Sequence, residues 1–290
     1  MEINKDNIKL VYDNAIKEIK NHIFKIDNKD YLAISSSYPG IWLEHTYDAL
    51  MYYYLFGDIS VAKNTILFFI KNQIDGQLPC FYRLNKELGY SQIQECVSFF
   101  NLAFKVYEII NDISFLNTIY DAAKKYISFL MKYRMTENKG LVEIFVGYDT
   151  GHDNSKRIED LKYKGYYAID GKRIGAKIKP NDLVIFGIDL ASNFYMNLKT
   201  ISKMAHILNK KDEEKYYYDL AINQKNKILK YFYDEKDLCF YDLNYDLRKR
   251  RIKSSAMFHV LLEHVLDIKS DKKIIDSLIN NIPDLHRCGG

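Results

Sequence analysis

The sequence of 290 residues predicts an all-α fold, built as a ring of helical hairpins. Most of the chain places apolar residues at the spacing of amphipathic helices, and no long stretch alternates as a strand would. Short turns that start with Gly or Asn followed by Asp join neighbouring segments, which is typical of helix pairs. The segments form no regular repeat, which favours a closed ring over an open solenoid.

Each predicted helix follows from one periodic segment. The first covers residues 8–23, where Ile, Val, Tyr and Ala recur on one face. Two of the turns contain a residue that can cap the next helix, Asp58 after Gly57 and Asp112 after Asn111. The other helices are predicted over residues 59–73, 96–110, 115–133, 190–208 and 216–232.

Between about residue 136 and residue 183 the helical period is lost, and Gly, Tyr, Lys and Asp become frequent. So long a loop inside a compact domain is typical of a functional segment or a lid. We expect Tyr163, Tyr166 and Tyr167 to form a short hairpin over a central pocket. The composition marks no boundary, so residues 1–290 are predicted to be a single domain.

The composition is that of an ordered globular protein, with 48% hydrophobic and 28% charged residues. The net charge of +4 is small, and the basic residues are spread among acids, which argues against a nucleic-acid partner. The basic run at residues 248–251, with Lys253, is interpreted as a solvated loop; the alternative is a contact with a polyanion.

The cysteines show neither paired spacing nor a zinc-type grouping with histidine, so we expect reduced thiols and no bound metal. The N-terminal residues lack an apolar signal region, and no run of about eighteen apolar residues occurs. These features predict a cytoplasmic protein without membrane association. The four thiols are Cys80, Cys96, Cys239 and Cys288.

The most polar segment, residues 147–157, reads Gly-Tyr-Asp-Thr-Gly-His-Asp-Asn-Ser-Lys-Arg. Glycines allow tight turns and a close approach to a ligand, while Asp, Asn and Arg side chains can protonate and orient a polyhydroxylated substrate. The alternative is an Asx-turn loop whose side chains bond to their own backbone.

Residues 149–157 resemble the Glu-Ser-Gly-Met-Asp-Asn-Ser-Pro-Arg signature of the clan of inverting glycosidases that includes trehalases, processing α-glucosidase I and mannosylglycerate hydrolases. The resemblance implies an (α/α)6 toroid, with Asp153 as general acid and Arg157 as a sugar contact at one rim of the ring. It also implies substrate-binding roles for His152 and Asn154. The segment differs from the signature at three positions: Asp149, His152 and Lys156.

Other segments between about residue 40 and residue 290 resemble the same clan. Residues 42–47 resemble its Trp-Asp-Ser-Tyr-Phe motif, with His45 where the clan has a sugar-binding Asp. Residues 76–79 resemble its Gly-x-Ile-Pro turn, and residues 184–198 its Val-Asp-Leu-Asn-Ala helix, with Asp189 as the acid. The residues implied to bind substrate in these segments and before the helix at 96–110 are Trp42, Glu44, His45, Gln94 and Asp189.

Each of these residues also has a structural interpretation. Trp42 is the only tryptophan and suits either stacking on a sugar or packing in the core. Glu44 and His45 suit either hydroxyl binding or the first turn of a helix. Asp189 suits either the pocket or a backbone bond at the rim. Gln94, like Gln92, precedes a helix in the manner of the clan's pocket-facing Thr-Gln segment.

The resemblance supplies no general base, because in the clan this is a Glu from the last part of the ring. The periodic segments amount to about nine helices, against twelve in a ring of six hairpins. Residues 282–290 resemble the start of the clan's Gly-Gly-x-Pro-Ser loop, so we expect a toroid that lacks its last helices. Glu263 has the neighbours Leu261, Leu262 and Val265 and is expected on a helix surface.

An incomplete ring would leave apolar side chains at both ends of the chain without partners. Such a seam favours self-association or poor solubility, so we expect the chain either to aggregate or to form an oligomer through it. The residues expected to be partly exposed along it are Val11, Ile16, Ile19, Val260, Leu261 and Ile275.

Together these patterns predict a glycoside hydrolase that cleaves an α-glucosidic or α-mannosidic bond with inversion, without a cofactor. The expected partner is an oligosaccharide or glycoside substrate. Two alternatives stand beside this prediction. One is a non-catalytic helical scaffold that binds a protein or glycan through its concave face, and the other is an inactive remnant of a glycosidase.

Overall fold

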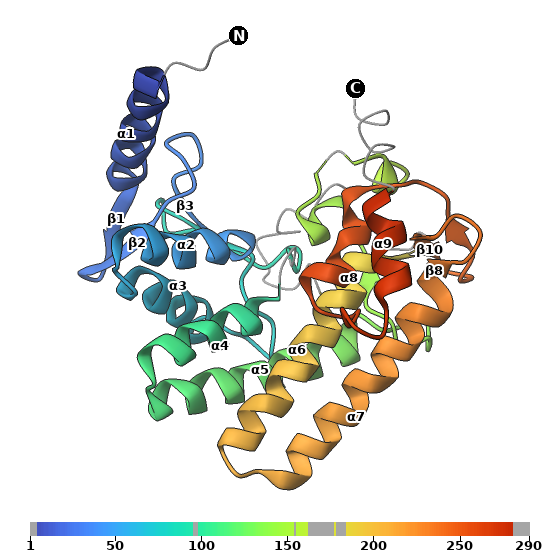
Figure 1. The fold of residues 1–290 in the computed structure, drawn as a ribbon. Coiled ribbons are helices and arrows are strands. Elements are labelled where there is room, and N and C mark those ends of the chain that lie inside the picture. Colours follow the sequence, from blue (N-terminus) through green and yellow to red (C-terminus); the bar gives the residue numbers. More distant parts are fainter. Residues whose placement is uncertain (1–4, 95–97, 154, 162–176, 178–183, 281–290) are drawn as a thin grey trace.

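The computed structural model describes residues 5–94, 98–153, 155–161, 177 and 184–280, and helices dominate them (Figure 1). Helices α2 to α7 lie in consecutive pairs, and the pairs follow one another around an arc. Each segment of predicted helical period contains a helix. The nine helices of the described residues are α1 (Lys5–Asn21), α2 (Thr46–Phe56), α3 (Ser60–Lys71), α4 (Phe99–Ile110), α5 (Ile113–Tyr133), α6 (Ile188–Ile207), α7 (Lys211–Lys227), α8 (His259–Leu262) and α9 (Lys272–Asn280).

The turns within the pairs use their Gly, Asn and Asp residues as predicted. Gly57 and Asn111 follow α2 and α4 in the left-handed conformation, with φ of 76° and 49°. Glycine adopts this conformation without steric cost, and Asn tolerates it better than most residues. Asp112 caps α5, because its side chain accepts the backbone N–H groups of Ser114 and Phe115.

Helix α6 is buried on all of its faces up to Ser202 and lies at the centre of the packing. It contacts α4, α5, α7 and α8, and its buried residues are polar as well as apolar. Helix α7, in contrast, buries only Tyr217, Ala221 and Gln224. A helix buried all round belongs to the core, whereas one with a single buried stripe lies at the periphery. The first turn of α6 therefore carries Asp189 into the interior.

Small antiparallel sheets occur between the helices, which the all-α prediction omitted. Their strands have two to four residues, too few to show alternation in the sequence. The sheets fix the segments that lead into and out of the helices. They are β1 (Ile23–Ile26) with β2 (Lys29–Leu32); β3 (Gly40–Trp42), β4 (Phe81–Arg83) and β5 (Leu88–Gly89); β11 (Lys249–Arg250), β10 (Asp242–Asn244), β7 (Ile185–Phe186) and β6 (Glu143–Ile144), in that order; and β8 (Tyr233–Asp234) with β9 (Cys239–Phe240).

The ends of the described chain agree only in part with an open apolar seam. On α1, Val11 is 68% exposed, as expected. Val260 is fully buried, so its expected exposure is wrong, because α8 packs against α6. The absence of further ring helices stays a prediction. None of the described helices has the length and apolar character needed to cross a bilayer. The remaining seam residues, Ile16, Ile19, Leu261 and Ile275, are half-buried.

Candidate active site

The polar loop 147–157 is anchored at its first end by Asp149, which is fully buried. The Asp149 carboxylate accepts the backbone N–H of Ile93 at 3.0 Å and that of Phe145 at 2.8 Å. The N–H of Val146, at 3.1 Å, and the buried guanidinium of Arg134 also donate to it. The bond to Ile93 ties the loop to the segment that precedes α4.

The other end of the loop is anchored by Arg157, which is fully buried between two carboxylates. Its Nη2 lies 2.9 Å from Asp189 Oδ1 and 2.6 Å from Asp242 Oδ1, and its Nε lies 2.6 Å from Asp242 Oδ2. Burial opposes the charge on Arg157, but the two carboxylates raise its pKa above the usual range. Burial also opposes ionisation of Asp189, yet Arg157 holds the pKa of Asp189 below its usual range. The loop, α6 and β10 therefore meet in one ion-pair network.

Gly187, at the start of α6, leaves room for this network. A Cβ atom at Gly187 would lie 2.4 Å from Asp189 Oδ1, 2.7 Å from Ile144 Cδ1 and 3.1 Å from Arg157 Nη2. Such distances are shorter than van der Waals packing allows, so a larger residue would displace the carboxylate.

His152 and Asp153 lie between the two anchored ends of the loop. The His152 side chain is 27% exposed, and its Nδ1 lies 3.2 Å from Arg157 Nη1. Its ring centroid lies 5.8 Å from that of His259, whose pKa burial lowers to about 4. Asp153 is exposed to solvent. The loop therefore presents an imidazole and a carboxylate on a support that is held from both sides.

Glu44 belongs to the 3-10 turn Leu43–His45, which follows β3. Its side chain is 17% exposed, and its Oε1 accepts a hydrogen bond from Gln94 Nε2 at 3.2 Å. The same oxygen lies 3.4 Å from Nε2 of His45, whose Nδ1 lies 3.0 Å from Asp48 Oδ2. Burial lowers the pKa of His45, while Asp48 opposes this shift. Polar contacts thus link Gln94 to Glu44, Glu44 to His45, and His45 to Asp48.

The Glu44 carboxyl is close enough to Asp153 to interact with it electrostatically. Burial, and after it the charges of Asp153 and Asp48, raise the pKa of Glu44 to about 7. A carboxyl with this pKa keeps its proton in about half of the molecules at pH 7, so it can donate as well as accept a hydrogen bond. Shifts of this kind concentrate at functional sites.

The structure brings Glu44, His45 and Gln94 together and places Asp153, which follows His152 in the loop, close enough to Glu44 to raise its pKa. Arg157 and Asp189 are fully buried, and each is the other's ion-pair partner, which ties the loop to α6. Their contact with a sugar stays a prediction. The predicted residues Asn154, Tyr163, Tyr166 and Tyr167 lie outside the described residues.

Trp42 packs mainly in the interior. Its side chain is 8% exposed, and its ring centroid lies 5.7 Å from that of Phe81 and 6.0 Å from that of Tyr38. It shares a small buried cluster with Phe81 and Cys80. This packing supports the structural interpretation, and stacking on a sugar stays a prediction.

The expected surface position of Glu263 is wrong, because its side chain is only 2% exposed. The Ser98 hydroxyl donates to Glu263 Oε2 at 2.7 Å, and the Ser98 N–H donates to Oε1 at 3.3 Å. Helix α8 is a single turn that ends before Glu263, so a helical period could not place it. Sequence reasoning also missed Arg134, Asp242 and His259, since each is an isolated polar residue with no motif around it.

The remaining predicted features are ordinary. Among the described residues, no three His, Cys, Asp or Glu side chains are grouped to hold a metal ion. Cys80 and Cys239 are buried thiols outside any disulfide, while Cys96 and Cys288 lie outside the described residues. Burial raises the pKa of the Cys80 thiol to about 11, which leaves it unreactive at neutral pH.

Comparison with known proteins identifies a family model and a protein that are similar to this chain. A family model described as the mannosylglycerate hydrolase MGH1-like glycoside hydrolase domain matches residues 38–281. An uncharacterized protein of Borreliella burgdorferi is 33% identical over 105 residues, which cover 36% of this chain and 22% of that protein. The match therefore spans less than a quarter of this curated relative.

Solved structures share the fold at low sequence identity. A GH63 mannosylglycerate hydrolase from Thermus thermophilus, in complex with glucose, aligns with a TM-score of 0.73 at 13% identity, over 94% of this chain and 75% of that one. The neutral trehalase Nth1 from Saccharomyces cerevisiae aligns with a TM-score of 0.66 at 14% identity, over 88% and 55% of the two chains.

Proposed function

Because the chain belongs to the mannosylglycerate hydrolase MGH1-like glycoside hydrolase family, we propose that it hydrolyses an α-glucosidic or α-mannosidic bond with inversion, with Asp153 as the general acid. The observation that carries this proposal is that Asp153 lies near Glu44, a mostly buried carboxyl with a pKa of about 7. Asp153 belongs to a loop that buried ion pairs anchor at both ends. The names of the similar structures, a mannosylglycerate hydrolase and a trehalase, support a substrate of this class.

In the proposed reaction, Asp153 gives its proton to the glycosidic oxygen while the bond between this oxygen and the anomeric carbon breaks. A water molecule, deprotonated by a second carboxylate, attacks the anomeric carbon from the opposite face. The charge of Asp153 is one cause of the raised pKa of Glu44, so the Glu44 carboxyl can hold a proton beside Asp153. We assign the base to none of the described residues: both oxygens of the buried Glu263 already accept from Ser98.

The residues around Asp153 divide into two proposed roles. Glu44, His45 and Gln94 bind sugar hydroxyls, since the partly exposed Glu44 and His45 and the buried Gln94 amide combine donors and acceptors in one place. Arg157 and Asp189 position Asp153: they fix the loop, so the carboxyl of Asp153 keeps its position when substrate binds.

A glycan-binding protein without turnover is the second candidate. The observation that favours it is the burial of Arg157, which the family resemblance implies as a sugar contact but which is committed here to two carboxylates. The same loop could then hold a sugar without completing the reaction.

Glycosyl fluorides separate these candidates. Fluoride leaves with little help from an acid, so the Asp153→Asn variant should hydrolyse α-glucosyl or α-mannosyl fluoride within about tenfold of the wild-type rate, yet cleave the corresponding disaccharides about 10²–10⁴ times more slowly. Proton NMR during the first minutes should show the β-anomer of the released sugar. Binding of a disaccharide without any turnover would support the second candidate, and equal losses on both substrate types would remove Asp153 as the acid.

A further inference from the structure

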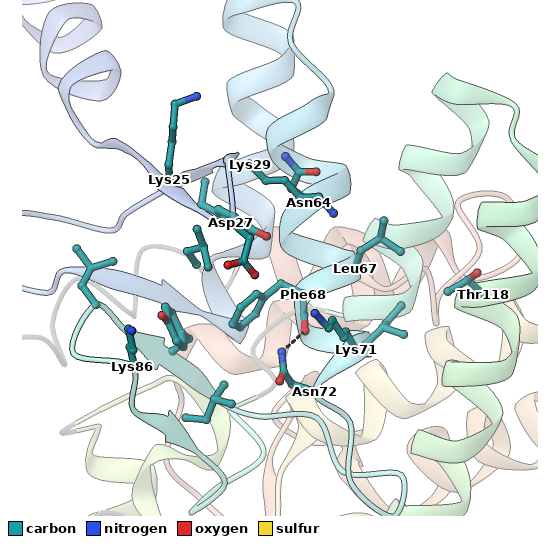
Figure 2. A pocket seen from close by; sticks show the side chains of 16 residues that line it. Lys25, Asp27, Lys29, Asn64, Leu67, Phe68, Lys71, Asn72, Lys86 and Thr118 are labelled. Atoms are coloured by element: carbon teal, nitrogen blue, oxygen red, sulfur yellow. Dashed lines mark hydrogen bonds between the residues drawn. The ribbon is translucent and has the colours of Figure 1, made fainter.

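A depression away from the candidate active site lies between the β1–β2 hairpin, α3 and the β4–β5 hairpin (Figure 2). We call it the lysine hollow. Its volume of about 730 Å³ is within the usual range for sites that hold small ligands. None of the residues discussed for the candidate active site lines it.

Strand β4 separates the lysine hollow from the Trp42 cluster. Successive side chains of a strand point to opposite faces. Phe81 packs against Trp42, whereas the next residue, Tyr82, packs against Phe68 of α3, with ring centroids 4.9 Å apart. Tyr82 and Phe68 both line the hollow. The two surfaces therefore lie on opposite sides of one sheet.

The hollow carries uncompensated positive charge. Four lysines and a single acid, Asp27, line it, and Figure 2 shows the lysines on different sides of the depression. Lys25 pairs with Asp30 at 3.0 Å. No ion-pair partner occurs among the described residues for the other three. These are Lys29, Lys71 and Lys86.

The basic run at residues 248–251 is the natural comparison, because it was the one charge cluster visible in the sequence. Each of its side chains pairs with an aspartate, so the run is largely neutralised and has little charge left for a polyanion. The lysines of the hollow come instead from the β1–β2 hairpin, the end of α3 and the β4–β5 turn, and only the fold gathers them. The pairs of the run are Arg248 with Asp246, Lys249 with Asp234, Arg250 with Asp160, and Arg251 with Asp237.

The other lining groups suit hydroxyls and carbon rings better than bare anions. Asn64 and Asn72 supply side-chain amides, and Tyr31 and Phe68 form an aromatic floor, with ring centroids 5.8 Å apart. Asp27 would repel a simple anion, but a carboxylate is a good acceptor for sugar hydroxyls. A ligand that carries both hydroxyl and acidic groups would use the whole surface.

We propose that the lysine hollow is a second binding site, for a saccharide that bears carboxylate groups. Hydroxyls and ring carbons contact Asp27, the amides and the aromatic floor, while the carboxylates lie against Lys71 and Lys86. Binding in the hollow does not require catalysis by Asp153, so this proposal is independent of the proposed function.

The ligand is longer than one sugar. A neighbouring depression of about 950 Å³ shares Ile70, Lys71 and Thr118 with the hollow and continues along α5. Its charged lining is mixed, with Lys124 and Lys125 beside Asp75 and Asp121, and Lys124 pairs with Glu213. Because Lys71 belongs to both depressions, an oligosaccharide whose acidic groups lie in the hollow can extend over it into the neighbouring one.

Isothermal titration calorimetry with trigalacturonate at about 1 mM tests the proposal. The wild-type chain should bind it, and should bind neutral maltotriose at least about tenfold more weakly. The double variant Lys71→Gln/Lys86→Gln should lose about tenfold in affinity. Lys203→Gln/Lys236→Gln is the matched control, since these exposed lysines lie outside the hollow, and it should bind as the wild type does.

Asp27→Ala distinguishes a saccharide site from a plain anion site. Removal of this carboxylate should weaken trigalacturonate binding if it accepts hydroxyls, and should strengthen it if the lysines merely attract charge. Stronger binding by the Asp27→Ala variant would overturn the proposal. So would an absence of binding by the wild type, equal losses in both lysine double variants, or tighter binding of inorganic phosphate or of a short single-stranded oligonucleotide than of trigalacturonate.

Discussion

Replacement of Arg157 by methionine should lower the free energy of unfolding by about 3–5 kcal/mol, a large share of the stability of a typical domain. The change leaves two carboxylates without their cation: Asp189 is fully buried and Asp242 is 3% exposed. Methionine occupies a comparable, unbranched volume, so the cost is mainly that of unpaired buried charge. Urea unfolding, followed by far-ultraviolet circular dichroism at pH 7, measures it.

The pH dependence of this loss has a definite sign. In the wild type, Arg157 holds the pKa of Asp189 below its unfolded value of about 3.9. The resulting stabilisation is present above that pH and is lost as the pH falls through the folded pKa. Without Arg157, burial raises the pKa of both carboxyls, so the variant is most stable in acid and loses stability as the pH rises. The stability gap between the two proteins should therefore be larger at pH 7 than at pH 4.

A triple variant provides the control. Arg157→Met combined with Asp189→Asn and Asp242→Asn removes the unpaired charges while it keeps the shape of the site, and it should recover most of the loss. A single variant within about 1 kcal/mol of the wild type at pH 7 would refute the argument. A loss that the triple variant does not recover, or one that does not change with pH, would also refute it.

Three further changes have defined outcomes. Gly187→Ala should destabilise the chain by about 1–3 kcal/mol, because its Cβ would lie 2.4 Å from Asp189 Oδ1, and an unchanged urea midpoint would contradict that reasoning. The stability of the Glu44→Gln variant relative to the wild type should increase by about 2–3 kcal/mol between pH 4.5 and pH 8.5. The folded pKa of Glu44, about 7, exceeds the unfolded one, so the wild type loses stability as the pH rises through 7, whereas glutamine does not titrate. Val11→Asp should shift a self-associating wild type toward monomer in sedimentation, because this side chain is 68% exposed on α1, and a wild type that is monomeric throughout would remove the expected seam.

The helices could be predicted because their determinants are local. The apolar face of α5 and the cap at Asp112 both lie within one stretch of sequence. The candidate site was predictable only where a motif covers it, as for Asp153. The ion-pair partners of Arg157, Asp189 and Asp242, lie 32 and 85 residues further along the chain, and no local sequence pattern predicts such pairings. The sequence therefore predicted a sugar contact at Arg157 but could not predict its pairing with two buried carboxylates.

Strand β4 also bears on how this protein can vary. Phe81 and Tyr82 are consecutive, yet one belongs to the Trp42 cluster and the other to the lysine hollow. A one-residue insertion or deletion at this strand would exchange its two faces and damage both surfaces together. Substitution at Tyr82 alone leaves the opposite face untouched. In related chains, the length of this segment should accordingly be conserved more strictly than the side chains that face the hollow.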